Sequence, residues 1–395
     1  MIVLAACSQQ TATLPSALPS GTSTILVVTP LMTNTATRIP TASETSVSLT
    51  LPAVTAPALI RIDFQDANNG WGIAANGHGY VLRTVDGGSS WLDATPPGAG
   101  SLGFSAVLTV LNSNDAWVLV PGMDYFSGTL YRTGDGGNSW SSSSAPFGGG
   151  FIRFTDESHG FALADRGTSA GSEAVELFQS TDGGATWSSV FHDDPSQRGA
   201  SDSLPLAGIK NGMTFRDART GWVTGSIPQA GQVYLYMTQD GGLSWVQQNI
   251  SLPAGYEAYP YLTQAPVFFG MEGFLPVTID LPGKPVLTFY TSQDGGLNWN
   301  GDPASSGQTI PAGLVAIADE KHIWCWDGSA TIYSSSGGTQ TWINNPASLD
   351  LSGNLSRLQF VPGFTGWALT QLDNAGHSQL YRTTNGIDWT PLIIH

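Results

Sequence analysis

The sequence predicts an all-β fold built from a repeated unit. Helical patterning is scarce, and short apolar runs are separated by turns rich in Gly, Asp and Asn. The 395 residues include 48 Gly and 13 Trp, and an eight-residue motif recurs along the chain. A second motif recurs upstream of the first with a spacing of its own. The composition therefore indicates the fold class, and the lengths of the repeats indicate the architecture.

The first motif is the octet STDGGATW, which ends at Trp187. The gaps between the final Trp residues of successive copies are 49, 47, 58, 54, 43 and 47. A period near 50 in Gly-rich, β-branched sequence is typical of propeller blades and not of helical repeats. The intact copies end at Trp91, Trp140, Trp187, Trp245 and Trp299, and the degenerate copies SSGGTQTW and TTNGIDW end at Trp342 and Trp389.

The second motif is an aromatic residue with an apolar residue seven positions before it. The aromatic positions are Trp71, Trp117, Phe161, Trp222, Phe274, Trp324 and Trp367, and the apolar ones are Phe64, Val110, Phe154, Phe215, Val267, Ile317 and Phe360. Each unit then reads as four short strands, which in the first unit are Leu59–Phe64, Trp71–Ala75, Tyr80–Thr84 and Trp91–Ala94. Four-stranded sheets of this size need neighbours to cover their faces. We therefore expect residues 58–395 to form a seven-bladed β-propeller with four-stranded antiparallel blades.

The octet falls at the turn between the third and fourth strands of each unit. There the Asp carboxylate can accept hydrogen bonds from the turn, and the two Gly residues supply positive φ. The degenerate copies support this reading, because Gly337 replaces the Asp in one and Asn385 replaces it in the other. A turn tolerates such changes, whereas a shared catalytic role does not. We expect structural roles for the octet carboxylates Asp86, Asp135, Asp182, Asp240 and Asp294.

The N-terminal segment resembles a bacterial lipoprotein leader. Residues 1–7 read MIVLAAC, in which a small residue precedes Cys7 as it does in a lipobox. The six residues before Cys7 hold no Lys or Arg and are short for a signal peptide, so either translation starts further upstream or the match is chance. Residues 8–57 are rich in Ser, Thr, Pro and Ala and predict a disordered linker. The expectation is an extracytoplasmic protein, either lipid-anchored to a bacterial membrane through Cys7 or secreted.

Charge and cysteine content exclude several classes of partner. The formal net charge is −16, and only 11% of the residues are charged, so a nucleic-acid-binding basic stripe is not expected. Binding of an anionic membrane through basic residues is disfavoured for the same reason, which leaves the lipid anchor as the predicted membrane contact. If Cys7 is acylated, Cys325 has no partner. The sequence thus predicts no disulfide, metal or cofactor site.

The fuller unit resembles the BNR or Asp-box repeat. Unit 1 reads IDFQDANNGWGIAANGHGYVLRTVDGGSSW, and unit 4 contains FRDARTGWVTG. This pattern resembles the photosystem II stability and assembly-factor family of propellers. The resemblance implies a non-catalytic scaffold with a protein partner, including membrane proteins. It also implies an arginine patch, to which Arg83, Arg132 and Arg382 correspond by position. The alternative is that these long side chains only cover the adjacent blade.

A sialidase-like enzyme is the second interpretation, since sialidases share the Asp-box. In that family three arginines hold the substrate carboxylate, beside a Tyr–Glu pair and an acidic Asp. The Arg-Ile-Pro signature has a literal match at Arg38, Ile39 and Pro40, but this lies in the predicted linker. Arg61 with Ile62 on the first inner strand is better placed but lacks the Pro. Because a shared fold is weak support for shared chemistry, we favour no catalysis.

Long loops supply a further candidate surface. The loop NISLPAGYEAYPYLTQ joins units 4 and 5 and contains Tyr256, Glu257, Tyr259 and Tyr261. Tyr rings beside a carboxylate suit a sugar or peptide, although such residues are more often packed within their loop. The sequence therefore predicts a binding propeller with a protein partner, and a glycan-binding or glycoside-hydrolysing propeller is the alternative.

Overall fold

The computed structural model describes residues 51–193, 203–301, 310–329, 331–339, 341–346 and 355–393. These residues contain β-strands, turns and loops but no helix, so the prediction of an all-β fold is confirmed. In the part described, no helix exists that could cross a membrane. The predicted acylation site Cys7 and most of the predicted linker lie outside the described residues.

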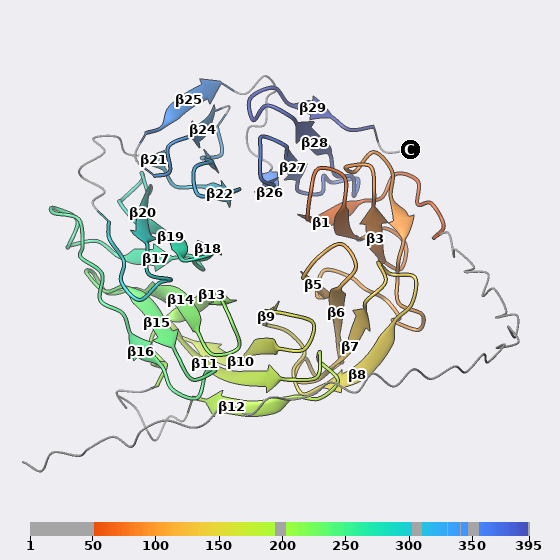
Figure 1. Ribbon diagram of the computed structural model, residues 1–395, viewed down its shortest axis with the longest axis horizontal. Coiled ribbons are helices and arrows are strands. Elements are labelled where there is room, and N and C mark those ends of the chain that lie inside the picture. The colour runs from red at the N-terminus through yellow and green to blue at the C-terminus, as the bar shows by residue number, and fades with distance from the viewer. Residues whose placement is uncertain are drawn as a thin grey trace, which may run out of the picture. The chain divides into compact units, whose positions relative to one another are not determined.

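Most strands group into antiparallel sheets of four in chain order (Figure 1). The strands of the first unit match the expected ones to within a residue or two at each end. The four-stranded sheets consist of β1 (Leu59–Phe64), β2 (Gly70–Ala74), β3 (Tyr80–Thr84) and β4 (Leu92–Asp93); β5 (Val107–Val110), β6 (Ala116–Pro121), β7 (Gly128–Thr133) and β8 (Ser141–Ala145); β9 (Phe151–Phe154), β10 (Gly160–Ser169), β11 (Ser172–Ser180) and β12 (Ser188–His192); β22 (Leu314–Ile317), β23 (Ile323–Trp326), β24 (Thr331–Ser335) and β25 (Ile343–Pro346); and β26 (Leu355–Phe360), β27 (Gly366–Thr370), β28 (Leu380–Thr383) and β29 (Thr390–Pro391).

The fourth and fifth repeat units share one nine-stranded sheet. It consists of β13 (Ile209–Phe215), β14 (Gly221–Ile227), β15 (Tyr234–Thr238), β16 (Val246–Gln247), β17 (Tyr261–Thr263), β18 (Val267–Phe269), β19 (Glu272–Ile279), β20 (Val286–Ser292) and β21 (Ile310–Pro311). The two units merge because β17, which belongs to the long connecting loop, pairs with both β14 and β19. Hydrogen bonding thus gives six sheets, and a count of seven blades stays a prediction from the repeats.

Aromatic stacking joins several of the units to the next. The ring of Trp117 on β6 stacks on Phe154 of β9 at 3.7 Å between centroids. The same contact joins Phe161 to Phe215 at 3.5 Å and Trp324 to Phe360 at 3.7 Å. These are residues of the second motif, so its spacing records how neighbouring sheets pack.

The same contact joins the last unit to the first. Trp367 of β27 stacks on Phe64 of β1 at 3.7 Å, and its indole N–H donates to the carbonyl of Gly87. Gln359 of β26 bonds both the N–H and the carbonyl of Phe64, at 3.0 and 2.9 Å. Glycine is required beside these rings, because a Cβ at Gly70 would lie 2.5 Å from the Phe64 ring. Side chains of the last unit therefore pack against the first, and β26 and β27 lie beside β1 in Figure 1.

The fifth unit departs from the predicted spacing. Val267 is 36% exposed, and the residue that packs on Trp222 is Phe268, at 4.6 Å. Phe268 pairs across the sheet with Gly273, as Phe64 pairs with Gly70 in the first unit. The turn before β19 is one residue shorter here, so counting seven positions back from Phe274 selected the wrong residue.

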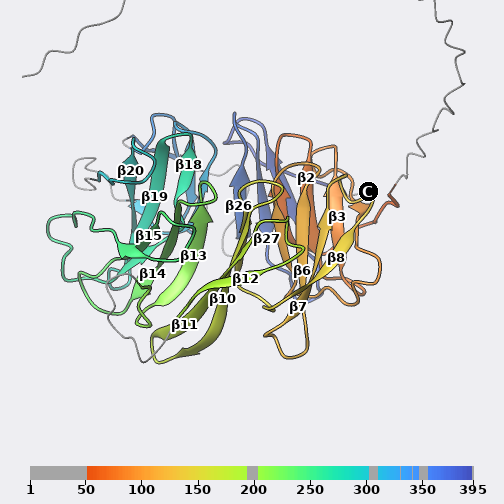
Figure 2. The same ribbon diagram turned by 60° about the horizontal axis from the view of Figure 1, so that its bottom comes forward.

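The turns and loops that connect the strands lie on two opposite faces of the ring (Figure 2). One face carries the β1–β2 type of turn together with the octet turn that precedes the fourth strand. The other carries the loops between second and third strands and the connections between units. Residues before β1 lie along β4, since the Val54 N–H donates to the carbonyl of Trp91 and the Asp93 N–H donates to the carbonyl of Pro52. Pro52 and Val54 of the predicted linker thus hydrogen-bond to the first unit.

Candidate binding site in the central cavity

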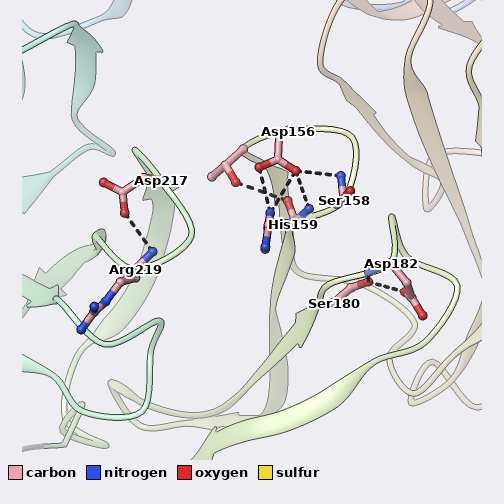
Figure 3. Close-up of polar contacts among 8 residues, drawn as sticks. Asp156, Ser158, His159, Ser180, Asp182, Asp217 and Arg219 are labelled. Carbon is pink, nitrogen blue, oxygen red and sulfur yellow. Dashed lines mark hydrogen bonds and ion pairs between the residues drawn. The ribbon is translucent and has the colours of Figure 1, made fainter. Parts of the chain in front are cut away.

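The octet carboxylates hold turns. Asp182 accepts hydrogen bonds from the Ser180 hydroxyl at 2.8 Å and from the N–H and hydroxyl of Thr186 at 2.9 and 2.6 Å. Gly183 and Gly184 have φ of 73° and 89°, which L-residues rarely adopt. The Gly183 N–H donates to Ser158 in the neighbouring β9–β10 turn. Figure 3 shows this turn beside that of Asp156 and His159.

The other intact octets repeat these contacts. Asp86, Asp135, Asp240 and Asp294 each accept the hydroxyl two residues before them and the N–H four residues after. Hydrogen bonds from the Thr186 side chain and N–H lower the pKa of Asp182. The Asn298 N–H and side chain lower the pKa of Asp294 to about 2. Carboxylates held ionised by turn donors are suited to structure rather than to proton transfer.

The predicted arginine patch is packed within the fold. Arg83 is 6% exposed and lies over the Trp71 ring at 5.3 Å. Its guanidinium donates to the carbonyls of Gly70 and Thr84 and to the Asn69 side chain. Burial lowers its pKa, and Asp66 partly opposes that shift. Such a side chain has its donors satisfied internally.

Arg132 and Arg382 are half-buried in equivalent positions. They lie over Trp117 and Trp367 at 5.4 and 5.7 Å. Arg382 also donates to the carbonyl of Ala67 in the first unit at 2.9 Å. Arg132 lies so close to Gly183 of the next unit that a Cβ there would collide with it. This setting matches the alternative reading, in which a long side chain covers the adjacent blade.

The tyrosine loop is also largely packed. Tyr261 is 1% exposed, and its hydroxyl donates to the Tyr256 carbonyl at 3.0 Å. Burial, followed by the charge of Glu257, raises the pKa of Tyr261 to about 12. Tyr256 and Tyr259 are half-buried against the same cluster, and only Glu257 of the four is exposed. A ligand role for this loop stays a prediction.

The structure shows a different candidate at the centre of the ring. A cavity of about 910 Å³ is lined by the innermost strands β9, β13, β18, β22 and β26 and the segment before β18. These strands lie nearest the middle of Figure 1. Its charged lining residues are Arg153, Arg216 and Arg357, and its other polar side chains are Asn211, Thr214, Gln264, Ser356 and Gln359. The lining therefore carries positive charge in a strongly acidic protein.

Three arginines influence one another here. Burial, followed by the charge of Arg357, lowers the pKa of Arg61 on β1 to about 10. Burial also lowers the pKa of Arg153, where Asp63 opposes the shift and Arg357 adds to it. The Nε of Arg61 is buried without a hydrogen-bond partner. Arg382 of the peripheral set also has a buried Nε without a partner. What distinguishes the central group is that three guanidinium groups share one nearby carboxylate, Asp63, which favours binding of an anion.

Arg216 is a different case, since it is tied into the wall of the cavity. Its guanidinium donates to the Gly295 carbonyl at 2.6 Å and lies 3.5 Å from the Asp217 carboxylate. We therefore assign the candidate site to Arg153 and Arg357, which line the cavity, and to Arg61, which lies outside the lining but is influenced by the charge of Arg357. We refer to these three residues as the cavity arginines. Sequence inspection singled out Arg61 alone. The sequence signal that could have identified Arg153 and Arg357 is a charged residue on the first strand of a unit, where most other units have a neutral residue.

Groups suited to acid–base or metal chemistry do not line this cavity. The lining of the described cavity contains no Asp, Glu, His, Lys, Tyr or Cys. Across the described ranges, no cluster of three His, Cys, Asp or Glu could hold a metal ion. Cys325 is buried on β23, where burial raises the pKa of its thiol to about 12. The described lining can bind an anion, and the carboxylate that acts on Arg61 and Arg153, Asp63, lies outside that lining.

Comparisons with known proteins place the fold. YCF48 bound to a D1 peptide matches with a TM-score of 0.53 and 16% identity, over 86% of this chain and 99% of that one. YCF48 from Cyanidioschyzon merolae matches at 0.53 with 19% identity, over 81% and 94%. This chain is a β-propeller. An ulvan lyase of polysaccharide lyase family 25 also matches, at 0.50 and 12% identity over 87% and 94%.

The propeller thus resembles in its fold both a protein solved with a bound peptide and a polysaccharide lyase. No protein-family model matches the sequence, and no curated protein matches it. The structural likeness to YCF48 agrees with the resemblance that the repeats indicated. At these identities the likeness extends to the fold alone, so function has to be argued from the site.

Proposed function

We propose that this chain is a non-catalytic, extracytoplasmic binding propeller that holds an acidic segment of a protein partner in its central cavity. The observation that carries the proposal is the charge of the cavity lining, in which Arg153 and Arg357 occur without a lining carboxylate, and the charge of Arg357 also acts on Arg61. Two further features support it: the absence of proton-transfer groups in the described lining, and the peptide complex of a structural neighbour.

Electrostatics favours an acidic ligand. Arg153 and Arg357 are exposed to water within the cavity, yet neighbouring strands surround Arg153 densely enough to lower its pKa. Asp63 is the carboxylate that opposes these shifts, and it also accepts a hydrogen bond from Gln65 at 2.7 Å. A carboxylate entering the cavity would bring compensating charge and acceptors for the free guanidinium donors.

The dimensions favour a short segment of chain. A volume of about 910 Å³ lies at the upper end of the range for ordinary ligand pockets. Apolar side chains, including Val267 and Leu314, alternate with the polar groups of the lining. Such a surface suits a peptide that carries one or two carboxylates and some apolar side chains.

The lining does not favour catalysis. Glycoside hydrolysis by the usual route needs two carboxyl groups flanking the bond. Removal of a proton next to a uronate carboxylate needs a positioned base, such as His, Tyr or Lys. None of these side chains lines the described cavity. A glycan remains the alternative ligand, because an acidic polysaccharide also carries carboxylates.

Attachment to a membrane completes the proposal. Cys7 in the sequence LAAC would be acylated, and the Ser/Thr/Pro-rich segment after it would connect the anchor to the propeller. YCF48 provides the analogy for the partner, since its solved complex contains a D1 peptide. The partner that we propose here is a protein at the membrane surface with an exposed acidic segment.

The test is binding of fluorescent peptides to the full-length chain, measured by anisotropy. An acidic peptide with a free C-terminal carboxylate should bind, and the Arg153→Ala/Arg357→Ala variant should lose about tenfold to a hundredfold in affinity. Arg219→Ala is the matched control, because Arg219 is exposed in the β13–β14 turn (Figure 3) and is not a lining residue of the cavity. Binding should weaken as salt is raised.

Three results would contradict the proposal. Equal affinity of the wild type and the double variant for the peptide would show that the peptide does not bind in the cavity. Cleavage of an acidic polysaccharide that is lost in the double variant would favour the glycan-active alternative. Binding of a neutral peptide as tightly as the acidic one would show that charge is not what the site selects.

A further inference from the structure

The β6–β7 tip is an unusually exposed apolar hairpin. It comprises residues 122–127, of sequence GMDYFS. Met123 is 100% exposed, Tyr125 is 66% exposed and Phe126 is 57% exposed. Phe104, in the connection between β4 and β5, is 74% exposed. Large apolar side chains gathered on one part of a surface indicate an interaction site.

The tip is held in one shape although its side chains are free. Asp124 accepts the N–H groups of Phe126 and Ser127, each at 3.1 Å, and the Ser127 hydroxyl at 3.0 Å. The Gly122 N–H donates to the Ser127 carbonyl at 2.7 Å. A Cβ at Gly148 would collide with the Tyr125 carbonyl, so the hairpin backbone packs closely on this glycine.

Tyr125 adopts a strained backbone conformation. Its φ is +59°, a region that a bulky L-residue rarely occupies. Gly or Asn would relieve that strain, yet the residue here is a half-apolar aromatic directed to solvent. Strain retained at an exposed position favours a function for the side chain.

The tip and Phe104 lie on the same face of the propeller. Connections between second and third strands and between units emerge on the face opposite the octet turns (Figure 2). The chain that leads back to Cys7 joins the described structure beside this region. Leu51 packs against the cluster that contains Leu102 and Ala106 of the β4–β5 connection. An anchor at Cys7 would therefore be attached through the side of the protein that exposes these residues.

The surface carries little charge. The β4–β5 connection, residues 94–106, has no charged residue, and Asp124 directs its carboxylate to the tip backbone. The nearby cation is Arg166, which lies 6.0 Å from the Phe126 ring and pairs with Glu176 at 2.9 Å. A neutral, aromatic and Met-containing surface suits the interfacial region of an uncharged bilayer better than a charged partner.

We infer that the β6–β7 tip and Phe104 form a second membrane contact, which inserts into the bilayer interface and orients the propeller on it. The occupant is the lipid headgroup and upper acyl region of an uncharged leaflet. This inference rests on the anchor at Cys7 in the proposed function, since the tip alone presents too few side chains for stable attachment. A lipid chain and a tip together supply the two signals that such attachment needs.

The test uses the full-length chain with Cys7→Ser, so that the anchor does not mask the tip. Cosedimentation with phosphatidylcholine vesicles should show weak binding, and adding Met123→Ser/Phe126→Ser should reduce the partition coefficient by about tenfold or more. The matched control is Val85→Ser/Leu297→Ser, which changes residues 57% and 49% exposed at octet turns on the opposite face. That control should bind vesicles as its parent does. Far-ultraviolet circular dichroism should confirm that all variants are folded.

Several outcomes would overturn the inference. They are no vesicle binding by the Cys7→Ser chain, equal binding by the tip variant, and an equal loss in the octet-turn control. Self-association of the parent that the tip variant abolishes, seen by sedimentation velocity, would assign the surface to a second copy instead. Peptide binding in the cavity is measured separately, and the tip variant should retain it. A negative result for membrane binding by the tip is thus distinguishable from a negative result for peptide binding in the cavity.

Discussion

Two sets of arginines occupy contrasting settings in this propeller. The peripheral set, Arg83, Arg132 and Arg382, lies over tryptophans at 5.3 to 5.7 Å. Two of its members also donate to backbone carbonyls of the β1–β2 region. At the centre, burial lowers the pKa of Arg61 and of Arg153, and the charge of Arg357 adds to both shifts.

The contrast separates a structural role from a binding role for one residue type. An arginine whose donors are satisfied by its own chain contributes packing and hydrogen bonds to stability. An arginine beside like charges costs stability unless an anion is bound. Substitutions should therefore affect folding at the periphery and binding at the centre.

The largest effect should come from the platform beneath a peripheral arginine. Trp117 is fully buried, stacks on Phe154 and donates to the Gly183 carbonyl at 2.8 Å. Trp117→Ala should lower the free energy of unfolding by about 3–5 kcal/mol, measured by urea denaturation. Trp117→Phe keeps a stacking ring and should cost less. A loss below about 1 kcal/mol for the Ala variant would show that this contact does not hold neighbouring units together.

The second-largest loss of stability should come from substitution of a peripheral arginine. Arg83→Ala removes a buried side chain, its cation–π contact and three hydrogen bonds. We expect a loss of about 2 kcal/mol in the free energy of unfolding. The exposed control Arg219→Ala should stay within about 0.5 kcal/mol of the wild type. If the two variants had equal stability, the structural role of the peripheral set would be refuted.

Substitution of the cavity arginines should not lower the free energy of unfolding. Arg153→Ala/Arg357→Ala removes mutual repulsion around Arg61, so the ligand-free protein should be unchanged or more stable by up to about 1 kcal/mol. Any gain should shrink as salt is raised, because salt screens the repulsion in the wild type. Thermal unfolding at low and high ionic strength measures both. A clear destabilisation would mean that these side chains serve the fold.

The smallest effect should be a pH dependence at an octet turn. The folded-state pKa of Asp294 is about 2, below its unfolded value near 4. Its stabilisation is therefore present above pH 4 and is lost as pH falls towards 2. Asp294→Asn should show a flatter decline of stability over that range. The measurement is urea denaturation between pH 4.5 and about 2, and parallel curves for both proteins would contradict the expectation.

The repeats made much of the fold predictable. The octet and the aromatic motif report local turns and contacts between neighbouring units, so their spacing indicated an all-β propeller and the strands of the first unit. The shorter turn before Phe274 was missed, because a spacing rule cannot detect a single deletion when Phe268 lies next to an apolar Val267.

The site was less predictable for a physical reason. Arg83, Arg132 and Arg382 share one position in the repeat, and a shared position suggested a shared surface. In three of the units that position holds an arginine over a tryptophan, and this is a packing contact. Arg61 and Arg357 also share a repeat position, whereas Arg153 occupies a different one on its inner strand. The first and last units, which carry Arg61 and Arg357, are brought together only by ring closure. Sequence order alone cannot show that convergence.

Thermal unfolding with and without the acidic peptide tests the central claim most directly, because one experiment reports both folding and binding. Wild type and Arg83→Ala should both gain stability on adding peptide, although Arg83→Ala starts from a lower melting temperature. Arg153→Ala/Arg357→Ala should melt at or above the wild-type temperature and gain nothing. The account would be contradicted if the double cavity variant gained as much as the wild type, or if Arg83→Ala alone lost the response.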